Sequence, residues 1–352
     1  MPPGLQGGGW EGFRHVVEEL RAGLRVLTPQ PALLREVVGR IPGGEGLSSA
    51  ERRAVMRGLE RVWHIMRLLG LLSEFFGERM FFGGGAVLNY IYMVRHGKPP
   101  RLTFDLDSAW YRRVSGKRAV LGEMVLFNKW LDEQGYTLSI PVSRGKAAKL
   151  YVVEYDAEKD FFPTLLSLRV PVVTRYDGRP FHEFLGIEDY SVIAELRRVF
   201  REVLGVRDPR IDYVRFEVSL DPAGMPREEA ALLDLFGSSV RATITPVEYQ
   251  LASKIRFKLA KDFGAELRYN IHDILKATLD LRLLEHVDID AVKRYAGSFD
   301  KGAVEANLSA LLTGEGRRLW ERNYHYTLIR RRHTLDELIK RVKKKLLQTN
   351  TP

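Results

Sequence analysis

The chain of 352 residues contains no cysteine, which excludes disulfide frameworks, thiolate zinc sites and cysteine nucleophiles. It also lacks any apolar run of about 18 residues, the length that a membrane-spanning helix requires. The first ten residues are rich in Pro and Gly and lack the basic stretch followed by an apolar core that marks a secretory signal. We therefore expect a cytoplasmic protein with no membrane partner.

Asn and Gln are scarce, whereas Arg, Lys and Glu are abundant, a bias typical of thermophile proteins. The hydrophobic share of 45% and the charged share of 28% are ordinary for a globular chain and exclude a disordered one. Lys and Arg number 55 against 45 Asp and Glu, so the formal net charge is +10. This excess favours an anionic partner such as nucleic acid or a nucleotide, although a basic surface without such a partner fits the charge equally well.

Hydrophobic patterns divide the chain into three segments. Residues 1–78 are predicted to be helical, and Ser48 with Glu51 forms the capping box of a long amphipathic helix. Residues 79–225 mix strand and helix patterns, and residues 226–352 return to helical patterns. The expected fold class is α+β, with a mixed-sheet domain between a helical N-terminal segment and a helical C-terminal domain.

Two carboxylates occur on one predicted strand. Polar and apolar residues alternate over residues 101–107, so Asp105 and Asp107 share one strand face, about 7 Å apart by the rise per residue. Like charges repel each other unless a cation lies between them, and carboxylate oxygens suit Mg²⁺. An isolated Asp-x-Asp pair is more often an ordinary solvent-facing pair, so this motif alone does not establish a metal site.

A glycine triplet precedes this strand. Gly83, Gly84 and Gly85 follow an apolar pair and open a predicted helix over residues 86–94. Glycine allows a ligand to approach the backbone closely, and a helix N-terminus attracts phosphate. The spacing fits neither the P-loop nor the dinucleotide-binding fingerprint.

A third carboxylate is expected from a later strand. Residues 211–220 alternate between apolar and polar, and Glu217 lies on the polar face. If this strand lies beside the Asp105 and Asp107 strand, three carboxylates can hold the metal pair of an in-line phosphoryl displacement. Glu154, on another predicted strand, is the alternative third carboxylate.

These motifs resemble the signature of the AbiEii-type nucleotidyltransferase toxins, a family of the DNA polymerase β-like superfamily. The similar residues are Gly83-Gly84-Gly85 followed by Arg101-x-Thr103-x-Asp105-Leu106-Asp107. The family usually has Ser or Thr where Gly85 stands, and residues 96–100 resemble a loop insertion. Lys254, on a helix that follows Pro246 and Glu248, resembles a later motif, and Asp273 matches one position of a final Arg-Asp-x-x-Asp motif. The resemblance spans residues 80–284.

The resemblance implies a nucleotidyltransferase domain that moves a nucleoside monophosphate from an NTP to an acceptor. The implied acceptor is tRNA or another RNA, and the implied setting is a toxin–antitoxin or phage-defence system with an antitoxin protein as partner. It also implies that Asp105 and Asp107 hold Mg²⁺ or Mn²⁺, together with Glu217 as a third ligand.

The resemblance further implies nucleotide contacts. Gly83, Gly84 and Gly85 would contact the triphosphate, and Lys254 would contact phosphate. Arg101 would bind phosphate or pair with Asp273. Asp273 would orient Lys254, or it is a helix-start acid that the helix dipole favours. Two other readings stay open. One is a non-catalytic RNA- or protein-binding module on a degenerate transferase fold. The other is a glycosyltransferase, in which Asp-x-Asp also binds a metal–nucleotide complex; the glycine-rich loop disfavours it.

Overall fold

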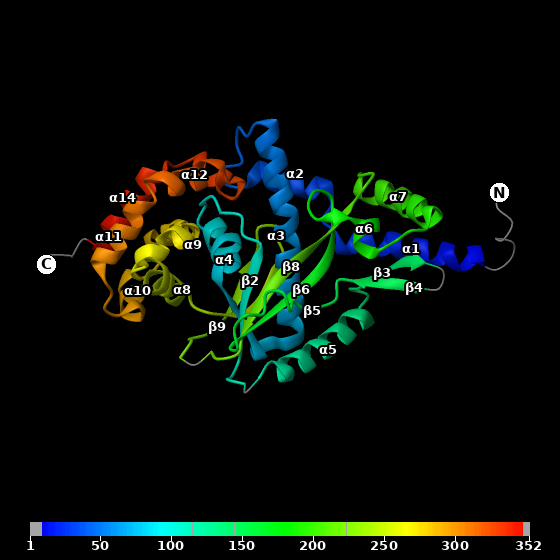
Figure 1. Ribbon diagram of the computed structural model, residues 1–352, viewed down its shortest axis with the longest axis horizontal. Coiled ribbons are helices and arrows are strands. Elements are labelled where there is room, and N and C mark those ends of the chain that lie inside the picture. The colour runs from blue at the N-terminus through cyan, green and yellow to red at the C-terminus, as the bar shows by residue number, and fades with distance from the viewer. Residues whose placement is uncertain (1–8, 115, 144–145, 223, 348–352) are drawn as a thin grey trace.

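The protein is described by a computed structural model over residues 9–114, 116–143, 146–222 and 224–347. Residues 1–8, which include most of the Pro/Gly-rich start, and residues 348–352 lie outside the described residues. Strands gather in the centre of the molecule, and helices cover them (Figure 1). The fold is α+β with a mixed sheet, as the sequence predicts.

The N-terminal segment consists of three helices, α1 (Gly9–Leu27), α2 (Pro31–Arg40) and α3 (Ser49–Phe76), followed by the turn η1 (Gly77–Arg79). The predicted capping box is confirmed: Ser48 Oγ accepts from the Glu51 N–H at 3.2 Å, and the Glu51 carboxylate accepts from the Ser48 N–H at 2.9 Å. Helix α3 lies along the sheet, because its apolar stripe packs against several strands. The N-terminal helices and the sheet thus share one hydrophobic core.

The main sheet has the strand order β5-β6-β8-β2-β1-β10-β9, and β7 pairs with β8 at one end. Its strands are β1 (Met80–Gly83), β2 (Asp105–Trp110), β5 (Glu154–Tyr155), β6 (Leu165–Thr174), β7 (Arg179–Pro180), β8 (Arg210–Ser219), β9 (Glu228–Leu233) and β10 (Ser239–Ile244). The pairs β1–β10 and β2–β8 are parallel and the others are antiparallel. The site described below depends on the neighbouring strands β1, β2 and β8.

Strands β9 and β10 correct the prediction that residues 226–352 are entirely helical. They form an antiparallel hairpin that extends the sheet beyond β1. Each strand is only six residues long. Strand β9 does not alternate clearly between apolar and polar residues, so its pairing with β10, which itself pairs with β1, decides its conformation.

Helices and a small hairpin complete the middle segment. A continuous helix over residues 84–95 begins as α4 (Gly84–Val87) and includes the π-helical turn η2 (Leu88–Met93). Helices α5 (Lys117–Glu133), α6 (Phe181–Leu185) and α7 (Tyr190–Leu204) follow in order, and β3 (Leu138–Ser143) pairs with β4 (Lys146–Leu150) in a separate two-stranded sheet.

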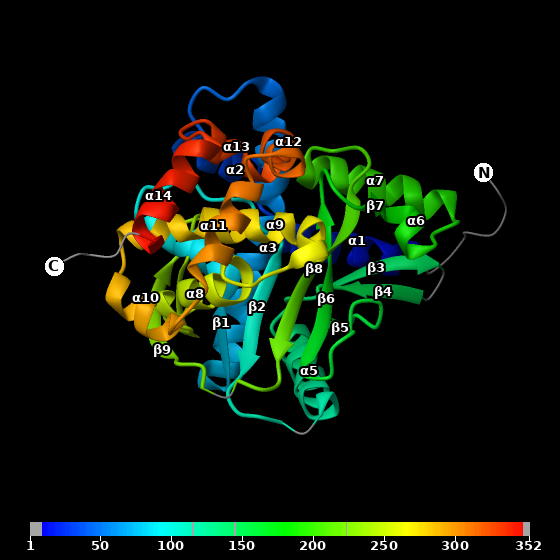
Figure 2. The same cartoon turned by 60° about the vertical axis from the view of Figure 1, so that its left-hand side comes forward.

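The remaining helices form a second hydrophobic core. They are α8 (Val247–Lys254), η3 (Ile255–Leu259), η4 (Gly264–Glu266), α9 (Leu267–Asp280), η5 (Leu281–Glu285), α10 (Ile289–Ala296), α11 (Lys301–Ala310), α12 (Gly314–Arg322), η6 (Tyr324–Tyr326), α13 (Thr327–Arg330) and α14 (Leu335–Leu347). Figure 2 shows these helices grouped on one side of the sheet, away from α1, α6 and α7. Leu88 and Met93 of the 84–95 helix belong to this second core, so that helix joins it to the sheet.

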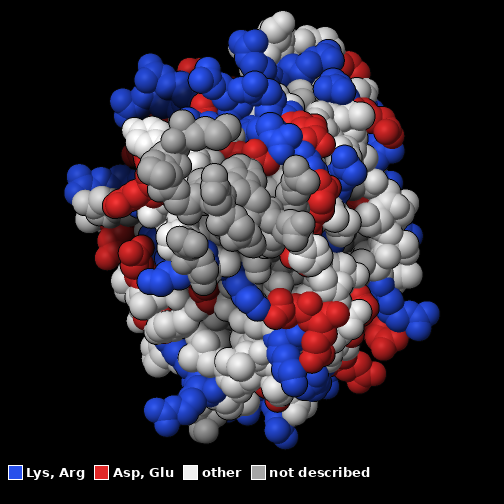
Figure 3. Space-filling model, turned by 90° about the vertical axis from the view of Figure 1, so that its right-hand side faces the viewer, with Lys and Arg blue, Asp and Glu red and all other residues white. Residues whose placement is uncertain are grey.

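Charges of both signs occur on the end of the molecule that carries α1. On that face Lys and Arg gather toward the top of the view and are interspersed with Asp and Glu lower down (Figure 3). In the described part of the chain, no helix is long and apolar enough to cross a membrane.

Candidate active site

Strand pairing brings two of the predicted carboxylates side by side. Asp107 on β2 is in register with Glu217 on the parallel strand β8 and with Gly83 on the antiparallel strand β1. Residues in register across neighbouring strands project from the same face of a sheet. Asp107 and Glu217 therefore line one open cleft, which has a volume of about 340 Å³ and also includes Gly84 and Lys254.

The predicted strand over residues 101–107 begins only at Asp105. The backbone N–H of Arg101 donates to the Asn89 side chain, that of Leu102 to the His325 carbonyl and that of Thr103 to the Tyr90 hydroxyl. Because these groups are satisfied by helices, they are not free for a strand ladder. Arg101 and Thr103 are consequently buried and do not share the exposed face of Asp105 and Asp107.

The glycine loop contacts the carboxylate directly. The Gly85 N–H donates to Asp107 Oδ2 at 3.3 Å. Gly84 has a φ of +68°, and a Cβ atom at this position would lie 1.6 Å from Asp107 Oδ2. A Cβ atom at Gly85 would lie 2.6 Å from the Arg101 guanidinium. A side chain at position 84 would therefore collide with Asp107, and a side chain at position 85 would collide with Arg101, so both positions require glycine.

The cleft raises the pKa values of two acids. The Asp107 side chain reaches solvent, but the surrounding cleft desolvates its carboxylate and so raises its pKa. The positive charge of Lys254 lowers this pKa, whereas the negative charge of Asp105 raises it. Desolvation also raises the pKa of Glu217, and the charges of Asp107 and Asp105 raise it further. Carboxylates in this situation are stabilised by a cation placed between them.

The donor set fits Mg²⁺ or Mn²⁺. Asp105, Asp107 and Glu217 offer only carboxylate oxygens, which are hard ligands. Among the described residues, no three His, Asp or Glu side chains converge closely enough to form a preformed metal site. Mg²⁺ is usually bound by one or two carboxylates together with substrate phosphates, so Asp105 and Asp107 are a sufficient protein contribution, with Glu217 beside Asp107.

Glu154, the alternative third carboxylate, lies elsewhere. It is on β5, at the edge of the sheet, where its carboxylate pairs with Arg169 at 3.2 Å. It does not line the cleft. Of the two acids, the structure brings only Glu217 to Asp107.

Lys254 is held at the cleft by a buried acid that the sequence analysis did not identify. Its Nζ lies 3.0 Å from Asp280 Oδ2, and Asp280 is completely buried. Arg101 donates to both Asp280 oxygens, from Nε at 2.8 Å and from Nη2 at 2.9 Å, and the Asn89 amide donates at 2.9 Å. Although burial favours the neutral acid, the charges of Arg101 and Lys254 hold the pKa of Asp280 far below its usual value.

This network corrects the roles predicted for Asp273 and Arg101. Asp273 neither orients Lys254 nor pairs with Arg101; it accepts from Lys258 at 2.7 Å and lies 3.5 Å from Lys276. Arg101 is 4% exposed, and its guanidinium donates to both carboxylate oxygens of Asp280. Its structural role is therefore to hold Asp280, not to bind phosphate.

A sequence signal for Asp280 does exist. It follows Asp273 by seven residues, about two helical turns, in a stretch whose neighbours Leu279 and Leu281 are buried. An acid within such an apolar stretch requires a buried cation.

Aromatic side chains form part of the cleft wall. Tyr249 and Phe257 line it, and Phe257 is 59% exposed. They lie on the same helical segment as Lys254, one turn to either side of it. Exposed aromatic rings beside a polar cleft are suitable surfaces for stacking a nucleobase.

No protein-family model matches the chain, and no curated protein matches its sequence.

Proposed function

We propose that the protein is a metal-dependent nucleotidyltransferase that moves a nucleoside monophosphate from an NTP to an acceptor and releases pyrophosphate. One observation carries the proposal: Asp107 of β2, the glycine loop that starts a helix and Lys254 line one cleft, and Asp105 lies on the same exposed face of β2 as Asp107. A purely structural surface has no need to hold carboxylates of raised pKa against a glycine loop.

Within this proposal Asp105 and Asp107 hold the divalent cation, and Glu217 supports them. When bound, the cation neutralises charge that develops on the transferring phosphoryl group. Gly83 and Gly84 line the cleft without side chains, so the polyphosphate can approach the start of the 84–95 helix closely.

Lys254 acts as a point charge toward the polyphosphate. Its ammonium has three donors, and Asp280 occupies one of them. Asp280 is in turn saturated by Arg101 and Asn89, so the position of Lys254 is fixed by groups that do not face the nucleotide. Such preorganised charge is the main catalytic device available to phosphoryl-transfer enzymes.

The proposed acceptor is tRNA or another RNA, which the net charge of +10 supports. A cytoplasmic toxin–antitoxin or phage-defence setting, with an antitoxin as partner, is proposed on the motif resemblance alone.

Incubating the purified chain with each labelled NTP, Mg²⁺ and total RNA tests the proposal. Labelled RNA and released pyrophosphate are expected with the wild type and not with Asp107→Asn. Glu154→Gln is the matched control, because it neutralises an acid of the same sheet outside the cleft. RNA that is bound but never labelled by the wild type, with any NTP, would favour the non-catalytic binding module instead.

A further inference from the structure

A second hollow adjoins the cleft along strands β2 and β8. Asp107 and Glu217, which are in register, line the cleft. Asp105 and Arg215, the pair in register two residues earlier, line the second hollow, which has a volume of about 210 Å³. Two residues along a strand span about 7 Å, so the two openings lie side by side on one face of the sheet. The other walls of the hollow come from α3, the lead-in to β2, α9 and η6.

Three cations of the hollow reach solvent. They are Arg61 of α3, Arg215 of β8 and Lys276 of α9, whose side chains are 24%, 44% and 32% exposed. Because they come from three different elements, they approach the hollow from different directions. Among the described residues that line it, Asp105 is the only acid.

The ion pairs of Arg215 and Lys276 leave donors available to a ligand. Arg215 donates to the buried Asp156 through Nε, at 3.1 Å, and its two Nη groups make no hydrogen bond within the described part of the chain. Lys276 lies 3.5 Å from Asp273, which already accepts from Lys258 at 2.7 Å. Lys258 lines the cleft and Lys276 lines the hollow, so one carboxylate serves two lysines, and positive charge continues from one opening to the other.

Aromatic rings lie among these cations. Phe104 and Tyr213 line the hollow, and the guanidinium of Arg61, which also pairs with Asp212, lies 4.7 Å from the centre of the Phe104 ring. Burial and the surrounding positive charges lower the pKa of His325, on the same wall, to about 4, so this ring is neutral at pH 7. Proteins hold single-stranded nucleic acid by combining such rings, on which bases stack, with cations that contact the backbone phosphates.

We propose that this hollow binds the end of a single RNA strand as the acceptor of the transfer reaction, an inference that rests on the function proposed above. Arg215 and Lys276 hold a backbone phosphate of the strand, and the aromatic rings hold its last base. Asp105 lines the hollow and shares the exposed face of Asp107, so a hydroxyl group bound here lies beside the cleft proposed for the NTP.

The transfer step uses both openings. The acceptor hydroxyl oxygen forms a bond to the α-phosphorus of the NTP, and the bond from that phosphorus to the oxygen that bridges to the β-phosphate breaks. Pyrophosphate leaves with the electron pair of the broken bond, and the hydroxyl proton passes to solvent. The volume of the hollow is below the roughly 300–1,000 Å³ of pockets that enclose a whole drug-sized ligand, so it fits one strand end and not a duplex.

The test is a fluorescence anisotropy titration of the full chain with a labelled single-stranded RNA, at several salt concentrations and without NTP. The double variant Arg215→Gln/Lys276→Gln should bind about tenfold more weakly at low salt. The slope of log K against log salt concentration should decrease in magnitude by about 1.4, since each phosphate contact of a single strand contributes roughly 0.7. Lys276→Gln alone should give half of this change in slope, and it leaves Asp273 paired with Lys258, so its fold should persist.

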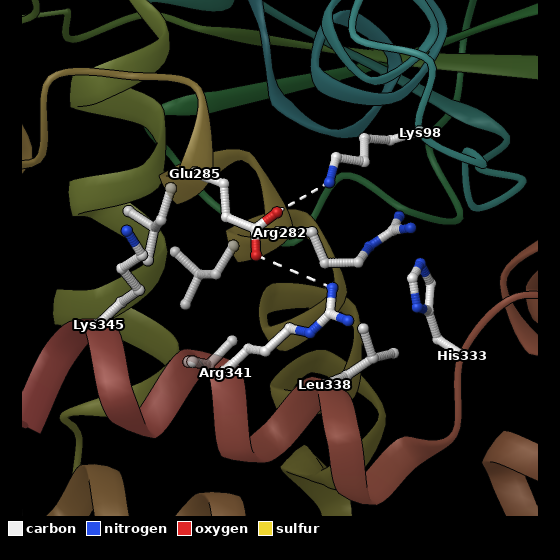
Figure 4. A pocket seen from close by; sticks show the side chains of 10 residues that line it. Lys98, Arg282, Glu285, His333, Leu338, Arg341 and Lys345 are labelled. Atoms are coloured by element: carbon white, nitrogen blue, oxygen red, sulfur yellow. Dashed lines mark hydrogen bonds and ion pairs between the residues drawn. The ribbon is translucent and has the colours of Figure 1, made fainter.

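A matched control removes two charges from α14 instead. Lys344→Gln/Lys345→Gln changes two exposed lysines of that helix. Lys345 borders a small pocket in which Lys98 and Arg341 already pair with Glu285, at 2.8 Å and 3.9 Å (Figure 4). This control should keep the RNA affinity and the salt slope of the wild type.

Transfer kinetics separate this site from the proposed function. With NTP and Mg²⁺, the double variant should have a raised KM for the RNA and an unchanged KM for the NTP. RNA binding that depends on Arg215 and Lys276, without any transfer by the wild type, would support the RNA site and refute the transferase. Equal RNA affinity and salt slope in the wild type and the double variant would overturn the inference, whether or not transfer occurs. Equal weakening in the α14 control would overturn it as well, as would binding of a phosphorylated peptide, but not of RNA, that depends on the same two cations.

Discussion

Arg101 and Asp280, 179 residues apart in the sequence, form a buried ion pair with two hydrogen bonds directly behind the proposed active-site cleft. The side chain of Asp280 is also bound by Lys254 at 3.0 Å, so one buried carboxylate connects the segment before β2 with α8 and α9. The geometry of the cleft thus depends on a residue that does not face it.

Asp280→Asn should destabilise the fold strongly. The substitution leaves Arg101 buried without a counter-charge, and breaking one side of a buried ion pair costs about 3–5 kcal/mol. Urea denaturation of the variant and the wild type measures the difference. Asp273→Asn, the same change two turns earlier in α9, removes only partly exposed ion pairs and should cost less than about 1 kcal/mol. Equal losses in both variants would contradict the role assigned to Asp280.

The stabilisation from Asp280 should disappear in acid. Its folded-state pKa is lowered, so its contribution is complete above the unfolded-state pKa of about 4 and is lost as pH falls toward the folded-state value. The difference in unfolding free energy between wild type and Asp280→Asn should therefore be constant from about pH 5 to pH 7 and shrink below about pH 4. Denaturation at a series of pH values measures it, and a difference that grows in acid would refute the sign of the shift.

Local patterns in the sequence predict much of this fold. The capping box at Ser48 and strand β8 follow from short-range patterns and occur where they are predicted. Alternation on β8 also predicts Glu217 on the face that the structure turns toward Asp107. Each of these features is encoded within a few neighbouring residues.

Features set by distant contacts are not predictable in this way. The partner of Arg101 is in α9, and no local pattern relates the two residues. The lead-in to β2 alternates like a strand, yet its N–H groups are taken by Asn89 and Tyr90. Strands β9 and β10 are similarly decided by pairing along the edge of the sheet. Tertiary contact overrides local pattern at each of these positions.

Gly84→Ala should abolish activity at an additional cost in stability. The new Cβ atom would lie 1.6 Å from Asp107 Oδ2, so the loop or the carboxylate must move, and the positive φ of 68° adds strain. Gly77→Ala is a matched control, because Gly77 also has a positive φ, of 52°, but no atom lies within 4 Å of the added Cβ. We expect the control to lose about 1 kcal/mol from backbone strain alone and to keep its activity. Denaturation measures the change in unfolding free energy, and the transfer assay measures activity. Full nucleotide transfer by Gly84→Ala would show that the glycine loop is not needed for the reaction.

Lys254→Met should weaken use of the NTP. Loss of the ammonium removes a charge from the cleft and leaves Asp280 with Arg101 and Asn89 as partners, so the fold should persist with reduced stability. The expected result is a decrease in kcat/KM of about 10²-fold or more, comparable to removal of one preorganised donor. Lys129→Met, which changes an exposed lysine of α5, should leave nucleotide transfer unaltered. An unchanged kcat/KM in Lys254→Met would show that the lysine only neutralises Asp280.

Asp107→Asn should lose activity while keeping or gaining stability. The pKa of Asp107 is raised by desolvation and by the nearby charge of Asp105, so the ionised side chain opposes folding at neutral pH. For a carboxyl with a raised folded-state pKa, this penalty is complete above that pKa and vanishes as pH falls to the unfolded-state value of about 4. The melting temperature of the variant should therefore equal or exceed that of the wild type near pH 8, and the two should converge near pH 4. Thermal melts at both pH values, run beside the transfer assay, measure stability and activity together. Full activity in this variant would refute the metal-site mechanism. A melting temperature well below that of the wild type at pH 8 would mean that the hydrogen bond from Gly85 to Asp107 stabilises the fold more than the desolvated charge destabilises it.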